Sequence, residues 1–474
     1  MVLKVYNTLT NSKEEFKPIE EGKVGMYVCG QTVYDNMHIG HGRTYIAFDI
    51  IRRYLQYRGY EVKTVINITD VNDKIDNRAD EEGKEPEEIA EKYARINLED
   101  FKKLGIRAEA FPRASEYIGE MKELVQRLVE KGFAYESEGN VFFDVKKFED
   151  YGKLSNQDLD DLKSERDDIK DREAKKDPRD FVLWRARKDY EHETYESPWG
   201  EGVPGWHIEC SAMSSKLLGD KFDIHGGGVD LVFPHHEDEI AQSEAASGER
   251  PWVKYWMHSG LVRLKDEKMS KSLGNFISTR EFLEKHEPEV LRLLVASTHY
   301  RKPLDYSEER IEQAEKNYSM LENSFRRIES ELRASDTVPS KLEEEDEKFI
   351  ERVKKLKRDF EKAMDDDFNT PEAVKVLMEI SRSINSYLDS ESPKRTVIEQ
   401  ARDIFEHLSW VLGVNPGSER ADEGVGRLVE KILEKRKDAR RDGNYELADE
   451  LREILEESGI NVEDTEKGVR WSMD

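Results

Sequence analysis

The feature that most constrains the fold lies in residues 23–69, where two apolar stretches flank a glycine-rich turn and a long helical pattern. "KVGMYVCG" (23–30) and "EVKTVINIT" (61–69) are typical of buried strands. Between them, residues 40–60 repeat apolar side chains at helical spacing, and Gly59 suits a helix C-terminus. A strand, a helix and a second strand in this order form a βαβ unit. The sequence therefore predicts a parallel sheet.

Three candidate functional residues fall at one edge of this predicted sheet. Cys29 ends the first strand, and His38 and His41 of "HIGH" lie just before the helix. Ligands of open parallel sheets bind beyond the carboxyl ends of the strands. The N-terminus of a helix offers unpaired N–H groups to phosphate, and Gly40 lets the backbone approach a ligand. These residues indicate a nucleotide site, although two ordinary polar histidines in a loop would produce the same tetrapeptide.

The pattern further along the chain predicts an interrupted sheet followed by helices. Residues 115–201 are irregular and highly charged, and strand signals return in "KFDIHGGG" (221–228). A helix is expected to follow, with Pro234 in its first turn. Long amphipathic helices are expected from Tyr306 to Leu412, then a linker, one further helix and short strands with a turn. We therefore expect a sheet that is split by an insertion.

Composition excludes several classes of protein. Asp and Glu outnumber Lys and Arg by 103 to 76, which gives a net charge of −27 and repels nucleic acid on average, but not from a local basic patch. A high-salt cytoplasm and a generally acidic proteome explain this charge equally well. No apolar run is long enough to span a membrane, and the N-terminus has no signal pattern. With only two cysteines, Cys29 and Cys210, we expect a cytoplasmic protein without membrane contact.

A second phosphate-binding candidate is "KMSKSLGN" (268–275). Lys268 and Lys271 are three residues apart in a loop rich in Ser and Gly, which suits a triphosphate. An exposed turn has a similar composition, so the octapeptide by itself leaves both interpretations open.

A metal site is the third candidate. His235 and Glu239 are four residues apart and share one helix face, but His236 is also three residues from Glu239, so spacing does not choose between the histidines. With Cys29 and Cys210 they make a set of residue types that bind zinc. A buried lone cysteine is also an ordinary small apolar residue, and a His/Glu pair is also an ordinary solvated face.

The order of "HIGH" and "KMSKS" around a split sheet resembles class I aminoacyl-tRNA synthetases. Longer stretches, among them "YVCGQTVYDNMHIGHGRTY", "GWHIECSAMS", "FDIHGGGVDLVFPHHEDEIAQSEAA", "MDDDFNTPEAV" and "YELADELREIL", are similar to the cysteinyl-tRNA synthetase family over essentially the whole chain. The resemblance implies an α/β fold with a Rossmann-like parallel nucleotide-binding sheet split by an insertion, then a helical bundle and a small mixed α/β C-terminal domain. The implied segments are two halves of the Rossmann catalytic domain (1–114 and 202–260), a connective insertion (115–201), a KMSKS and stem-contact region (261–310), a helical bundle (311–414) and an anticodon-binding domain (427–474).

The resemblance also implies the reaction and its cofactors. L-cysteine is activated by ATP, with Mg²⁺, to cysteinyl-adenylate, and the cysteinyl group is then transferred to tRNA(Cys). His38 and His41 would stabilise the α-phosphate and the leaving group, and Lys268 and Lys271 the β and γ phosphates. The implied ATP contacts are Gly40, Gly226, Gly227, Gly228, Asp230 and Lys271.

The substrate and metal residues follow from the same resemblance. One Zn²⁺ would be held by Cys29, Cys210, His235 and Glu239, and would favour the thiolate of cysteine over the hydroxyl of serine. Trp206, Thr69 and Cys29 are expected to contact the substrate, although core packing explains Trp206 equally well. His207, His225 and His236 would surround the metal.

The tail is expected to recognise tRNA. Arg440, Asp449 and Asp464 match family positions that contact the anticodon, and Trp471 could stack on a base. "EKRKDARR" (434–441) is a local basic stretch that suits phosphate or simply faces solvent. The family is usually monomeric.

One departure and two rival functions remain. The family's "TDIDDKI" is "TDVNDKI" here, with Asn72 in place of an acid, which puts any role of that charge in doubt. One rival is a ligase that joins activated cysteine to an amino sugar, which would be expected to lack the C-terminal tail. The other is a non-catalytic paralogue, which would be expected to have lost "HIGH" or "KMSKS".

Overall fold

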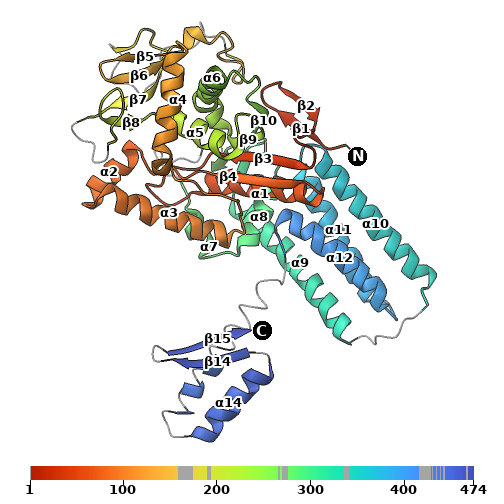
Figure 1. The fold of residues 1–474 in the computed structure, drawn as a ribbon. Coiled ribbons are helices and arrows are strands. Elements are labelled where there is room, and N and C mark those ends of the chain that lie inside the picture. Colours follow the sequence, from red (N-terminus) through yellow and green to blue (C-terminus); the bar gives the residue numbers. More distant parts are fainter. Residues whose placement is uncertain are drawn as a thin grey trace. The chain divides into compact units, whose positions relative to one another are not determined.

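The structure is a computed structural model (Figure 1). It describes residues 2–157, 174–188, 194–264, 267–268, 276–334 and 341–415, together with 429, 431–433, 435–437, 439–440, 444–458, 460–465 and 468–473 of the C-terminal part. The chain divides into two compact units, Met1–Val414 and Asn415–Asp474, which are described separately.

The first unit is built on a four-stranded parallel sheet with the order β10-β9-β3-β4. The strands are β3 (Lys23–Val28), β4 (Glu61–Ile66), β9 (Phe222–Gly228) and β10 (Val253–Ser259). Helix α1 (Ile39–Tyr57) connects β3 to β4, so the predicted βαβ unit and the parallel sheet are confirmed.

The chain order places a topological switch point beside β3, and ligands of open α/β sheets usually bind at such points. The chain leaves β3 toward β4 on one side, and β9 joins β3 on the other, so the carboxyl ends of β3 and β9 meet at a topological switch point. The register slips there: Val28 pairs with Ile66, whereas Thr32 bridges to Thr69, so the segment after β3 holds one more residue than its partner. Such a bulge redirects side chains at the end of a strand.

The segment between β4 and β9 is more regular than its sequence pattern indicates. It contains α2 (Asp73–Glu82), α3 (Pro86–Lys103), α4 (Ile118–Glu130) and α5 (Trp206–Leu218). It also contains an antiparallel sheet of β5 (Ala134–Ser137), β6 (Asn140–Phe143), β7 (Phe181–Ala186) and β8 (Gly202–Pro204). These strands are three to six residues long. Because they are so short, the alternation of apolar and polar residues that marks a strand is not recognisable among the surrounding charged residues.

Helices follow the second half of the sheet, as predicted. Helix α6 (Glu237–Ser247) connects β9 to β10. Helices α7 (Thr279–Leu283) and α8 (Pro288–Ala296) then precede a bundle of α9 (Glu308–Ala334), α10 (Glu344–Asp365), α11 (Thr370–Leu388) and α12 (Arg395–Leu412). Smaller sheets comprise β1 (Lys4–Asn7) with β2 (Ser12–Glu15), and β11 (Val262–Leu264) with β12 (Glu267–Lys268) and β13 (Leu304–Tyr306). Figure 1 shows the long bundle helices side by side.

The helix after β9 starts beside a kink. The helical turn η5 (Val232–His236) runs directly into α6, which begins at Glu237, and its only non-helical residue is Phe233, with φ −138° and ψ 134°. Pro234 thus lies in the first helical turn after this kink, as predicted. Steric conflict with the proline ring disfavours helical backbone in the residue before a proline, so Phe233 interrupts the helix ahead of Pro234.

The second unit contains the predicted helix and strands, and the turn predicted between the strands lies outside the described residues. Helix α14 (Tyr445–Glu457) is followed by β14 (Ile460–Thr465) and β15 (Gly468–Met473), which pair antiparallel from Ile460 with Met473 to Thr465 with Gly468.

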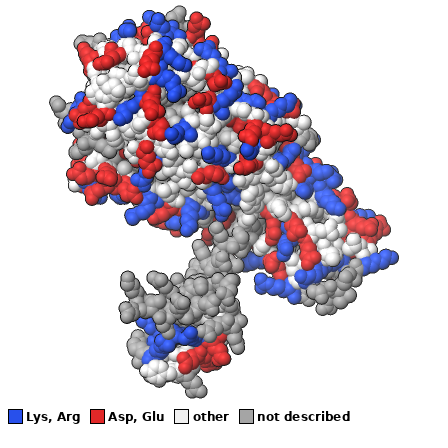
Figure 2. Space-filling view, viewed as in Figure 1, with Lys and Arg blue, Asp and Glu red and all other residues white. Residues whose placement is uncertain are grey.

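The surface charges and the hydropathy of the helices agree with the expectations from the composition. Among the described helices, none combines the length and apolar character needed to cross a membrane. Acidic and basic side chains are interspersed over the face drawn in Figure 2, so the excess of acid is spread out there.

Candidate active site and metal centre

Four side chains from four different segments meet at the switch point. Cys29 follows β3, Cys210 lies in α5, His235 in the turn η5 and Glu239 in α6, and all four are buried. One ligand atom of each lies within 4.8 Å of the others. The N–H of Cys29 donates to Gly226 O of β9 at 2.9 Å, which fixes the position of this cysteine at the switch point.

The distances in this cluster suit a tetrahedral ion. The sulfurs of Cys29 and Cys210 are 3.7 Å apart, and two sulfurs on one zinc at the usual bond length would be about 3.8 Å apart. Glu239 Oε1 lies 3.6 Å from Cys29 Sγ and 2.9 Å from His235 Nε2. Glu239 Oε2 makes no hydrogen bond of good geometry within the described residues, and it lies 3.4 Å from His225 Nε2. The donor set therefore fits a zinc ion.

A second set of four ligands overlaps the first. Cys29 and Glu239 also lie with His225 and His236 within 4.8 Å. Nε2 of His225 and of His236 are 3.3 and 3.2 Å from Cys29 Sγ, but His236 Nε2 is 4.0 Å from Glu239 Oε1. The set with Cys210 has two thiols and the shorter His–Glu contact, so it is the better zinc site.

Burial governs the electrostatics of the cluster. It raises the pKa of Cys29 well above its usual value, and that of Glu239 to about 8. Burial opposes ionisation of Cys210 as well, but hydrogen bonds with Cys29 and His235 lower the pKa of Cys210 to about 5. Burial disfavours the charged form of His235, and Glu239 and Cys210 outweigh it and raise its pKa to about 10. A bound cation would favour the ionised forms of Cys29 and Glu239, which burial by itself disfavours.

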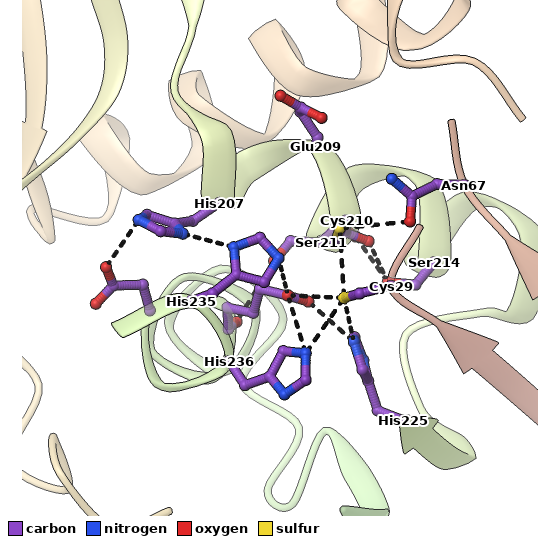
Figure 3. Close-up of polar contacts among 12 residues, drawn as sticks. Cys29, Asn67, His207, Glu209, Cys210, Ser211, Ser214, His225, His235 and His236 are labelled. Carbon is purple, nitrogen blue, oxygen red and sulfur yellow. Dashed lines mark hydrogen bonds and ion pairs between the residues drawn. The ribbon is translucent and has the colours of Figure 1, made fainter. Parts of the chain in front are cut away.

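The three predicted neighbouring histidines all contact this cluster (Figure 3). His207 Nδ1 lies 2.7 Å from His235 Nδ1, and its Nε2 lies 3.3 Å from a carboxylate oxygen of Asp238. His236 Nδ1 lies 2.8 Å from His258 Nε2. His258 was not identified from the sequence, because the distance of 22 residues from His236 carries no local signal.

Trp206 forms the accessible side of the cluster. Its indole stacks on the ring of His235 with centroids 4.2 Å apart, and the residue remains 41% exposed. It is therefore not a core residue.

Thr69 is buried beside two polar residues that sequence reasoning missed. Its hydroxyl donates to Glu209 Oε2 at 2.8 Å and accepts from Asn67 Nδ2 at 3.2 Å. Glu209 directly precedes Cys210, and this adjacency was the available signal. Asn67 ends the strand pattern of β4 and resembled an ordinary strand-end residue.

The "HIGH" segment forms the N-terminus of α1. His38 is the N-cap, and its Nδ1 accepts from the N–H of His41 at 3.2 Å. The two rings stack with centroids 3.7 Å apart. A Cβ on Gly40 would lie 2.8 Å from His38 Cε1, so only glycine leaves room for this ring.

The residues that follow "KMSKS" pair with those around "HIGH". Ile39 N–H donates to Ile277 O at 3.0 Å, and Thr279 N–H donates to Met37 O at 2.7 Å. The backbone of Lys268 pairs with Arg263 in the β11–β12 ladder. Lys271 lies outside the described residues.

The triple glycine has a packing role that was not predicted. A Cβ on Gly226 would lie 2.2 Å from Phe48 Cε1, one on Gly227 2.9 Å from Leu231 Cδ1, and one on Gly228 2.5 Å from Asp230 Oδ1. The protein's own side chains occupy these positions, and the ATP contacts that the resemblance implies for this segment stay a prediction. Asp230 itself is exposed.

Asn72 has a structural role that needs no charge. It is the N-cap of α2, and its side-chain oxygen accepts from Lys74 N at 3.1 Å. Asn and Asp are equally good N-caps, so the substitution at this position preserves the helix start.

The predicted anticodon residues lie in the second unit. Arg440 and Asp449 are exposed. Asp464 lies in β14 opposite Val469, and Trp471 in β15 opposite Val462, but their side chains are outside the described set. Residues 434, 438 and 441 of the basic stretch are also outside it.

Comparison with solved structures establishes the fold class. A methionyl-tRNA synthetase from Mycobacterium tuberculosis in complex with methionyl-adenylate aligns with a TM-score of 0.63 and 16% identity, covering 84% of this chain and 92% of that one. A putative arginyl-tRNA synthetase from Campylobacter jejuni aligns with a TM-score of 0.60 and 12% identity, covering 84% and 94%. The fold is thus that of class I aminoacyl-tRNA synthetases, as predicted.

Family models and relatives narrow the class. The model described as "tRNA synthetases class I (C) catalytic domain" matches residues 15–316, a DALR domain model matches 359–415, and the "Cysteinyl-tRNA ligase anticodon binding domain" matches 422–471. Proteins named cysteine–tRNA ligase from Thermococcus onnurineus and Pyrococcus horikoshii are each 49% identical, with 99% of both chains covered. A protein named cysteine–tRNA ligase from Bacillus licheniformis is 44% identical, again with 99% of both chains covered. The chain belongs to the cysteine–tRNA ligase family.

Proposed function

We propose that this chain is a cysteine–tRNA ligase that uses ATP to activate L-cysteine to cysteinyl-adenylate and transfers the cysteinyl group to tRNA(Cys), releasing AMP and diphosphate. The observation that carries the proposal is the meeting of two kinds of site at one sheet edge. The buried cluster of Cys29, Cys210, His235 and Glu239 suits a thiol ligand and its metal. The N-terminus of α1, capped by His38, suits a phosphate.

The cluster would select the amino acid. Cys29, Cys210, His235 and Glu239 would hold one zinc ion, which when bound supplies an electrophilic centre that takes the substrate thiolate as a further ligand. Serine lacks a group that ionises readily, so this contact would discriminate strongly between the two amino acids. Trp206, stacked over His235 and partly exposed, would cover the bound side chain.

The activation step would depend on positioning and charge. The substrate carboxylate attacks the α-phosphate of ATP, a new C–O–P link forms, and diphosphate leaves with Mg²⁺. His38 and His41, held by stacking at the start of α1, would donate to the α-phosphate and the leaving group. Lys268 and Lys271 would stabilise the β and γ phosphates. Further ATP contacts are proposed at Gly40, Gly226, Gly227, Gly228 and Asp230.

The remaining segments would bind tRNA. The first unit would comprise the Rossmann catalytic halves (1–114 and 202–260), the insertion (115–201), the stem-contact region (261–310) and the bundle (311–414), and residues 427–474 would bind the anticodon. Arg440, Asp449 and Asp464 would contact its bases. We also propose that the protein acts as a monomer in the cytoplasm.

The decisive experiment measures exchange of diphosphate into ATP with cysteine or serine, before and after zinc removal by a chelator. Exchange with cysteine alone, lost on chelation and restored by zinc, is expected. Esterified cysteine on added tRNA would then separate this function from ligation to an amino sugar. An absence of cysteine-dependent exchange at both low and high salt would refute the proposal and favour a non-catalytic paralogue.

A further inference from the structure

The two residues that flank His38 are both held by the segment that leads into α7. Ile39 N–H donates to Ile277 O at 3.0 Å, and Thr279 N–H donates to Met37 O at 2.7 Å. These two bonds lie on either side of His38 along the chain, so they fix the backbone that carries its ring. The position of His38 therefore depends on where the segment before α7 lies.

Arg280, the next residue of the chain, fastens this segment to α3. Its Nε and Nη2 donate to Asp100 Oδ1 at 3.1 and 3.0 Å. Nη2 also donates to Glu99 Oε2 at 2.8 Å and to Ile96 O at 3.3 Å. Arginine stays protonated in proteins and has no acceptor, so the direction of all these bonds is fixed. Bonds to three groups of one helix hold the guanidinium in one place.

Helix α3 is in turn fixed on α1, the helix that His38 caps. Phe101 of α3 packs edge-to-face on Tyr45 of α1 with ring centroids 4.8 Å apart, and both rings are buried. Arg53 Nη2 of α1 donates to Gly105 O, just beyond the end of α3, at 2.7 Å. The guanidinium of Arg280 therefore closes a triangle of α1, α3 and α7, with His38 at the corner where α1 and α7 meet.

The pair of Arg280 and Asp100 is a poor device for stability alone. Asp100 is 0% exposed and its Oδ2 makes no hydrogen bond within the described residues, whereas the side chain of Arg280 is 27% exposed. Desolvation of a buried carboxylate opposes most of what its ion pair contributes to stability. A pair of this kind is better explained by the position that it specifies.

We propose that Arg280 is a positioning residue that acts through residues 277–279 to hold His38 in place for the activation step. The inference rests on the proposed function, in which His38 stabilises the α-phosphate and the leaving group. Without the guanidinium, residues 277–279 lose four hydrogen bonds to α3 and can shift together with the backbone beside His38. The cysteine cluster is built from other segments, so binding of the amino acid does not depend on Arg280.

The test compares the cost of losing Arg280 with and without His38. The variants are Arg280→Gln, Arg280→Lys, His38→Ala and the double variant Arg280→Gln with His38→Ala, in the zinc-loaded full-length protein. Diphosphate exchange gives kcat and KM, and calorimetric titration gives Kd for L-cysteine. Arg327→Gln is the matched control, because Arg327 of α9 is 34% exposed and likewise joins two helices by bonds to Asn385 and Asp389 of α11 and its C-cap.

The expected loss is confined to catalysis and disappears when His38 is absent. Arg280→Gln should lower kcat about 10- to 100-fold, because a misplaced catalytic group loses about this much, with Kd for cysteine within about threefold. Arg280→Lys, which retains the charge, should recover part of the loss. In the His38→Ala background, Arg280→Gln should lower kcat less than about twofold, because the group that it positions is gone. The control should keep kcat within about twofold.

Several outcomes overturn the inference. An equal loss of kcat with and without His38, or a loss of cysteine affinity as large as that of kcat, would make Arg280 a general structural residue. Unchanged kcat in Arg280→Gln would remove the positioning role. If Arg280→Gln fails to fold, Arg280→Lys in the two backgrounds gives the same comparison. Failure of the proposed function is recognisable separately, because the wild-type protein would then show no cysteine-dependent exchange, which refutes both proposals.

Discussion

The replacement Gly40→Ala should separate the placement of His38 from the stability of α1. The added Cβ would lie 2.8 Å from Cε1 and 2.9 Å from Nδ1 of His38. The ring must move roughly 0.6 Å or more to reach ordinary contact, and it then leaves both its stack on His41 and its bond to the His41 N–H. Loss of the cap costs about 1 kcal/mol, and alanine in place of glycine in a helix returns about the same.

The free energy of unfolding should therefore change by less than about 1 kcal/mol, whereas activity should fall strongly. Displacement of a catalytic group by an ångström can cost about 100-fold, so kcat for diphosphate exchange should fall about 10- to 100-fold. The assay combines exchange kinetics with urea unfolding. Gly119→Ala is the matched control, since Gly119 is also the second residue of a helix, α4, and its Cβ would meet nothing within 4 Å. A Gly40→Ala variant with exchange within threefold of wild type would refute the reasoning.

Two other sites give further predictions. Asp49→Asn should destabilise the first unit by about 3–5 kcal/mol in urea unfolding, because it leaves Arg52, Arg53 and Arg292 buried without their carboxylate. Burial opposes ionisation of Asp49, but Arg292, Arg53 and Arg52 lower its pKa to about 2. Its contribution of about 2.5 kcal/mol is therefore present above about pH 4 and lost as pH falls through 2, and the wild type but not Asp49→Asn should show this slope. Trp206→Ala should change the unfolding free energy by less than about 1 kcal/mol, because the indole is 41% exposed, yet weaken cysteine binding about tenfold in calorimetry. Trp206→Phe should keep most of the wild-type affinity for cysteine. If the alanine and phenylalanine variants bind cysteine equally well, the aromatic stack does not contribute to cysteine binding.

The sequence predicted the parts of the fold that depend on local pattern. Residues 23–69 carry their strand, turn and helix in apolar spacing and glycine placement, and the structure confirms them as β3, α1 and β4. The sequence did not reveal that β9 pairs with β3 rather than with β4. Pairing between strands almost 200 residues apart is decided by which faces the intervening segments bury, and no local pattern records it.

The candidate metal residues were available from sequence for a different reason. Cysteine is rare in this chain, so Cys29 and Cys210 were conspicuous, and a resemblance supplied His235 and Glu239. Glu209 and Asn67 were missed because the chain contains many glutamates and asparagines, and nothing in a linear sequence marks which of them are buried. In the structure both side chains are almost fully buried, and both form a hydrogen bond with Thr69. Asn67 Oδ1 also lies 3.8 Å from Cys210 Sγ.

The choice between His235 and His236 shows how adjacent identical residues serve different parts of one site. Both histidines follow Pro234 in the helical turn that begins after the kink at Phe233, at spacings of four and three from Glu239. His235 Nε2 lies 2.9 Å from Glu239 Oε1, whereas His236 Nε2 is 4.0 Å away and its Nδ1 contacts His258. Successive residues of a helix point about 100° apart, so one ring faces the carboxylate and the other faces the surrounding network.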